Sequence, residues 1–112
     1  GPWGAATAGA AAMTSPYISV WMLHPHAATA IWLPWVLLGL VRRSPLITAL
    51  ATAGLLAGGH PETAAHAGMI VAGTMLMHSR WWQGLFWLTA GAGLAAPVWM
   101  PFVEEVLRSA TL

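Results

Sequence analysis

The sequence predicts an all-α fold: a polytopic transmembrane helical bundle of about four to five membrane segments, followed by a C-terminal interfacial helix. Apolar residues make up 58% of the chain and charged residues 6%, against about 45–50% and about 25% in average soluble domains. So few charges cannot cover the surface of a soluble domain of 112 residues. They also leave charge-free runs over 1–41, 44–61, 63–79 and 81–103, and a helix needs roughly 17–20 apolar residues to span a bilayer.

Length and composition also exclude several classes of protein. A chain of 112 residues is enough for one domain, so we expect residues 1–112 to form a single membrane-embedded unit. The basic residues are four scattered arginines without a lysine, which form no basic stripe, so we expect no nucleic acid partner. The absence of cysteine excludes a disulfide scaffold. No motif predicts a bound cofactor.

The first charge-free run is about twice as long as one membrane span, so we expect it to fold back on itself. The break is expected at Leu23-His24-Pro25-His26, because proline removes a backbone donor and disfavours helix in the residue before it. This predicts a first segment over Ala5–Met22 and a second over Ala27–Val41, which ends at the pair Arg42-Arg43.

The rest of the chain divides at proline and glycine. A third segment is predicted over Pro45–Ala57, ended by two glycines, which are a common helix C-terminal signal. The fourth, Pro61–His78, begins with proline, which is favourable at a helix N-terminus. The fifth covers Trp81–Ala96. We expect the tail, Val98–Leu112, to form an amphipathic helix along the interface.

Small residues predict close packing between these helices. Gly54 and Gly58 form a GxxxG pair, and Ala64, Gly68 and Ala72 repeat every four residues along the fourth segment. Such faces let helix backbones approach closely in lipid.

Charge predicts how the segments are oriented. Two segments separate the basic pair from the next basic residue, so the two basic positions are expected on one side of the membrane. The positive-inside rule makes that side cytoplasmic. The cytoplasmic residues are then Arg42, Arg43 and Arg80, and His24, His60 and Glu62 lie on the outer side.

The densest polar cluster begins at His60 and ends at His66. Glu62 and His66 are four residues apart and would share one helix face. They could supply two metal ligands, or the carboxylate could hold the imidazole in one tautomer. The cluster lacks the His-Glu-x-x-His pattern of zinc peptidases and would need a third ligand, so we expect no metal.

Two other interpretations stay open for this cluster. Glu62 can interact with the helix dipole at a wet interface while His66 satisfies a neighbour, or the cluster can bind a polar substrate. The candidate substrate-binding residues are His24, His26, His60, Glu62 and His66. No catalytic residue is identified.

The chain also contains longer motifs. They are His24-Pro25-His26-Ala27-Ala28, then Trp32-Leu33-Pro34-Trp35-Val36-Leu37-Leu38 with a basic pair, then Gly59-His60-Pro61-Glu62-Thr63-Ala64, and later Ala95-Ala96-Pro97, Met100-Pro101-Phe102 and Arg108-Ser109. Over nearly its whole length the chain resembles part of the YfhO-type bacterial membrane proteins, which belong to the GT-C class of polytopic glycosyltransferases.

The resemblance implies a multi-pass enzyme of the bacterial inner (cytoplasmic) membrane that uses polyprenyl-phosphate-linked sugars, with its chemistry on the outer face. His60 and Glu62 match the family motif and would line the donor or acceptor site. Family members are several times longer, and their catalytic acid is expected in an outer loop before the matched part. This chain has no aspartate, so that acid is not carried over, and the resemblance does not settle whether the chain is an enzyme.

Two functional hypotheses follow. In the first, the chain is the core segment of a GT-C-type glycosyltransferase and is not catalytic alone. In the second, it is a small accessory transmembrane subunit that packs against a larger membrane protein complex. The partners expected are the lipid bilayer, the transmembrane helices of a larger protein and, in the first case, a polyprenyl-phosphate sugar.

Overall fold

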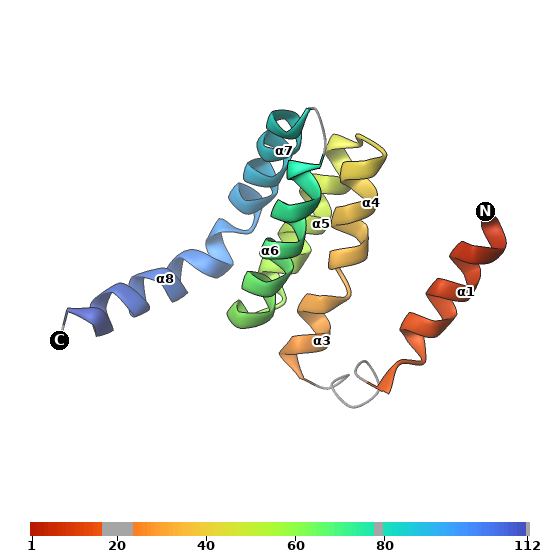
Figure 1. Cartoon of the computed structure of the whole chain (residues 1–112). Helices are drawn as coiled ribbons and strands as arrows, with labels where there is room; N and C mark the ends of the chain where they lie inside the picture. The colour runs from red at the N-terminus through yellow and green to blue at the C-terminus, as the bar shows by residue number, and fades with distance from the viewer. Residues whose placement is uncertain (17–23, 78–79, 112) are drawn as a thin grey trace.

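The computed structural model describes residues 1–16, 24–77 and 80–111, and these are almost entirely helical (Figure 1). No strand occurs within these ranges. The helices are α1 (Pro2–Met13), α3 (Pro25–Ala30), α4 (Leu33–Val41), α5 (Pro45–Ala57), α6 (Pro61–Leu76), α7 (Trp81–Leu94) and α8 (Ala96–Ala110).

Most of these helices begin at a proline. Proline occupies the first or second position of every helix above except α7, where its missing N–H costs nothing. Side chains cap two of them: the Ser44 hydroxyl accepts from the Ile47 N–H at the start of α5, and the His60 ring accepts from the Thr63 N–H at the start of α6. The local sequence therefore sets where each helix starts.

The predicted segment Ala27–Val41 is not one continuous helix. It divides into α3 and α4, with a turn at Ile31 and Trp32. Pro34 explains the division, because it has no N–H to donate to the carbonyl four residues earlier and its ring crowds that carbonyl.

The prediction of a polytopic transmembrane bundle with an interfacial tail is wrong. Among the described residues, no single helix is both long and apolar enough to cross a membrane. The longest, α6, has 16 residues, against about 20 for a typical span. α7 and α8 meet the length and composition criteria only as a pair, and the chain bends by 82° between them. Long charge-free runs predicted long helices, but the run over residues 1–41 contains several helices, and α5 ends at two glycines.

Two of the predicted membrane segments extend beyond the described residues, and Leu23 of the predicted break and Leu112 of the predicted tail also lie outside them. The first, Ala5–Met22, coincides with α1 only as far as Met13, and its residues 17–22 lie outside the described ranges. The fourth ends at His78, which lies outside them as well.

The core lies between α4, α5 and α6, which run in alternating directions together with α7 (Figure 1). Its buried residues are Val36, Leu40, Ala51, Leu55, Ala67 and Val71. Glycines allow the helices to approach: Gly39 lies against Thr48 where α4 meets α5, and Gly91 lies against the Ala49 carbonyl where α5 meets α7.

One of the two predicted small-residue faces packs against other parts of the chain, and the other does not. Gly54 packs against the Trp32 ring and Gly58 against Thr29, so close packing at the GxxxG pair is confirmed. A Cβ on Gly68 would instead meet nothing within 4 Å. That face of α6 borders open space rather than a neighbouring helix.

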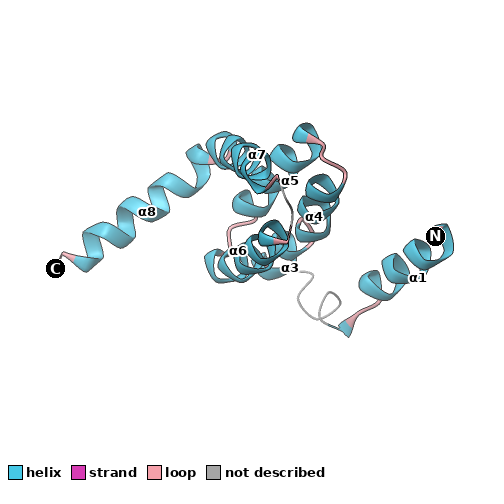
Figure 2. Cartoon of the chain, turned by 45° about the horizontal axis from the view of Figure 1, so that its top comes forward, coloured by secondary structure: helices cyan, strands magenta, loops and turns pink. Residues whose placement is uncertain are grey.

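The two terminal helices extend away from this core. In both views α1 and α8 project from the bundle (Figures 1 and 2), and neither contains a buried residue. The radius of gyration is 15.1 Å, compared with about 13 Å for a compact chain of this length. Much of the apolar surface of this chain is therefore uncovered.

Candidate functional site

Two of the predicted site residues meet where α3 packs beside the start of α6. The rings of His26 and His60 have centroids 3.5 Å apart and are tilted by 39°. The Thr63 hydroxyl lies 2.8 Å from Nδ1 of His60 and 3.3 Å from Nδ1 of His26. One hydroxyl thus links the two imidazoles, and we call these three residues the histidine cluster.

The hydrogen bonds favour one set of tautomers in this cluster. Nδ1 of His60 accepts from the Thr63 backbone N–H at 3.1 Å, so its neutral ring carries the proton on Nε2. The Thr63 hydroxyl can then donate to the same Nδ1 and accept from a proton on Nδ1 of His26. This arrangement uses both of the ring nitrogens that face the Thr63 hydroxyl.

The other three predicted residues are His24, Glu62 and His66. His24 is the N-cap of α3 and is exposed. Glu62 and His66 lie one turn apart on α6, and both are exposed. Among the described residues no group of three His, Cys, Asp or Glu side chains could hold a metal ion. The predicted substrate-binding set is therefore brought together only in part.

A cap role for His60 can be tested by substitution. We expect His60→Ala to lower the free energy of unfolding by about 1 kcal/mol, because it removes the acceptor for the Thr63 N–H. His60→Asn should restore most of the loss, since asparagine is among the best N-cap residues. Urea unfolding followed by circular dichroism measures both.

His66→Ala provides a matched control, because His66 is an exposed residue of the same helix. An equal loss of stability in His60→Ala and His66→Ala would contradict the cap role.

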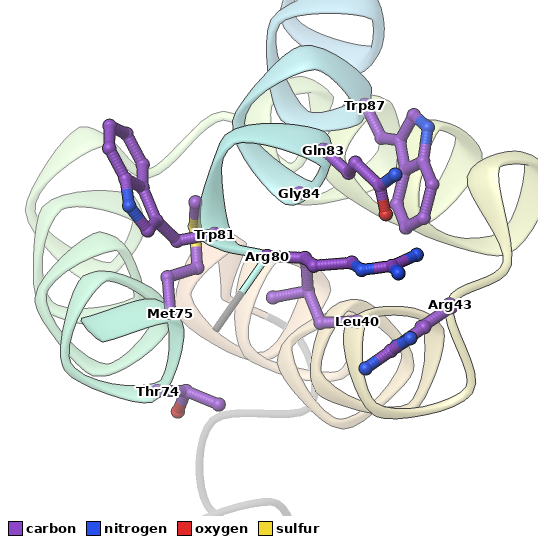
Figure 3. Close-up of a pocket in the computed structure, with 9 residues that line it drawn as sticks. All are labelled: Leu40, Arg43, Thr74, Met75, Arg80, Trp81, Gln83, Gly84 and Trp87. Atoms are coloured by element: carbon purple, nitrogen blue, oxygen red, sulfur yellow. The ribbon is translucent and has the colours of Figure 1, made fainter. Parts of the chain in front are cut away.

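The opposite end of the bundle carries a pocket between the α4–α5 turn and the start of α7. Arg43 and Arg80 both line it, and no carboxylate does. In Figure 3 the Arg80 side chain extends across the pocket toward the side where Arg43 and Trp87 lie. This arginine pocket has a volume of about 30 Å³.

Two larger cavities lie along α6. A central cavity of about 400 Å³ is lined by residues of α4, α5, α6 and α7, all of them apolar except Thr52. A second cavity, of about 510 Å³, lies beside His60, and Trp99 and Phe102 of α8 form part of its lining. We call it the histidine-end cavity. Both are large enough for the hydrocarbon part of a small molecule.

Sequence reasoning assigned Arg43 and Arg80 to membrane orientation and did not recognise them as parts of a pocket. The sequence could have predicted that the two arginines lie near each other. In an up-and-down order of helices, the turns before Pro45 and before Trp81 fall at the same end of the bundle. Thr63 was also missed, since its role depends on how α3 packs against α6. The structure places the arginines at one end and His24, His60 and Glu62 at the other (Figure 1), while the membrane side of each end stays a prediction.

Comparisons with known protein families, with curated proteins and with solved structures give no match to this chain. The resemblance to the glycosyltransferase family stays a prediction.

Proposed function

We propose that the chain is an accessory helical subunit that docks on a larger membrane protein through one face of α8. The observation that carries this proposal is a row of apolar residues on a helix that projects from the bundle. Trp99, Phe102, Val103, Val106 and Leu107 follow the spacing of a single helix face, and we call them the α8 stripe.

Most of the α8 stripe is exposed in the part of the chain that the structure describes. Trp99 and Phe102 line the histidine-end cavity, whereas Val103, Val106 and Leu107 are 39%, 47% and 62% exposed. An amphipathic helix with an open apolar face is the form in which one helix enters a groove on another protein.

The charges of α8 favour a protein partner over a lipid surface. Its polar face carries Glu104, Glu105 and Arg108, which sum to one negative charge. Helices that lie on membranes typically carry lysine and arginine there, because bilayers expose anionic lipids. The α8 helix lacks this attraction.

The large exposed surface of the chain also supports the proposal that a partner protein covers part of it. The chain exposes 7764 Å², against about 5,900 Å² for a folded monomer of 11.8 kDa. Its exposed large apolar residues also outnumber the buried apolar ones. Extended apolar surfaces of this kind typically mark sites of interaction with proteins or membranes.

Photo-crosslinking in native cells tests the proposal. A photoreactive residue at Val106 or Leu107 is expected to give one discrete crosslink to a larger membrane protein, and the same residue at Glu105 is expected to give none. Crosslinks to lipid alone from Val106 would overturn the proposal.

Substitution on the same helix provides a second measurement. Val106→Glu is expected to release the chain from the complex in a native gel, because it places a charge in the docking face. Ser109→Glu adds the same charge outside the α8 stripe and should leave the complex intact. Release by both variants, or by neither, would contradict docking through this face.

A further inference from the structure

The three cavities lie in a row beside α6, and neighbouring cavities share lining residues. Met75 and Trp81 line both the arginine pocket and the central cavity. Leu56 and Ala64 line both the central cavity and the histidine-end cavity. We call the combined feature the α6 groove. We propose that it binds one long-chain fatty acid, with the carboxylate at Arg43 and Arg80 and the hydrocarbon chain along α6.

The wall of the groove suits hydrocarbon. No charged side chain lines the central cavity, and the one hydroxyl there, on Thr52, donates to the Thr48 carbonyl at 2.7 Å. A polar ligand group would find no partner in this section and would lose its hydration. Gly68 and Ala72 keep the section open, because they place little or no side chain in it.

One end of the groove suits an anion. Arginine binds carboxylates through charge-assisted hydrogen bonds, and two arginines line this pocket without an acidic residue. The pocket of about 30 Å³ holds roughly two waters, which matches the two oxygens of a carboxylate better than a larger polar headgroup.

The backbone at Arg43 provides independent support. Arg43 has a φ of 54°, in the left-handed region that favours glycine. It occupies the position after the α4 C-cap where glycine is usual, and the Ser44 N–H bonds to the Gly39 carbonyl across it at 2.9 Å. An arginine at this position carries a conformational cost, and Arg43 is one of the residues that line the pocket.

The length of the groove fits one acyl chain. From Met75 to Ala64 the helix rises about 16 Å. One leaflet of a bilayer, whose thickness an acyl chain spans, is about 15 Å, half of a hydrocarbon core of about 30 Å. A free fatty acid fills this length with a single chain, whereas a phospholipid brings a second chain and a bulkier head.

Native mass spectrometry of the full chain, released from a mild non-ionic detergent, tests the proposal. We expect one bound hexadecanoate per chain, and at least about tenfold weaker binding of hexadecanol, which has the same chain without the charge. Equal binding of the acid and the alcohol would overturn the role of the arginines. Preferential binding of phosphatidylglycerol would overturn the assignment to a free fatty acid.

Substitutions can test separately the site for the carboxylate and the path of the hydrocarbon chain. Arg43→Gln combined with Arg80→Gln is expected to weaken hexadecanoate binding about tenfold, while Arg42→Gln, outside the pocket, should not. Gly68→Leu should block the groove without disturbing the fold, since a Cβ there meets nothing within 4 Å. Gly73→Leu adds the same side chain at an equally open site of α6 outside the groove lining. Loss of binding in both glycine variants, or in neither, would overturn the assigned path of the chain.

Discussion

Gly91→Ala is expected to destabilise the bundle by about 3 kcal/mol, the upper part of the usual range for overpacking. A methyl group at this position would overlap the Ala49 carbonyl oxygen and the Thr52 side chain. Both belong to α5, the helix with which α7 packs most extensively. Backbone cannot rotate away as the end of a flexible side chain can, so α5 and α7 must separate. Urea unfolding followed by tryptophan fluorescence measures the loss.

Gly93→Ala is the matched control on the same helix. A Cβ on Gly93 meets nothing within 4 Å, so the substitution should stabilise α7 by about 0.5–1 kcal/mol through helix propensity alone. A similar response of the two variants would show that α5 and α7 are not in contact at Gly91.

The sequence predicted helix bounds well where both ends carry a local signal. The third predicted segment, Pro45–Ala57, coincides with α5, because a serine and a proline mark its start and two glycines mark its end. The break at Pro34 was missed, since this proline lies in a long apolar run that was interpreted as one span. Charge-free length is evidence about the environment of a chain, and it does not establish that a helix continues through the run.

The candidate site was predictable only in part, for a related reason. Glu62 and His66 share a face by spacing alone, and the structure leaves both exposed. The contact of His26 with His60 joins residues 34 positions apart and depends on the packing of α3 beside α6. Helical spacing reports neighbours within one helix, whereas the histidine cluster and the arginine pocket each combine residues of different helices.

Leu55→Ala is the second substitution for which we expect a large effect, a loss of about 3 kcal/mol. Leu55 is 6% exposed and belongs to the core cluster with Val36 and Val71. Because it also borders the central cavity, it has fewer packing contacts on that side, and the cost should lie below the upper limit of about 5 kcal/mol for leucine. Leu50→Ala, on the same helix at 53% exposed, should cost less than about 0.5 kcal/mol. Thermal unfolding of both variants measures the two losses of stability. Comparable losses would mean that α5 does not direct Leu55 into the core.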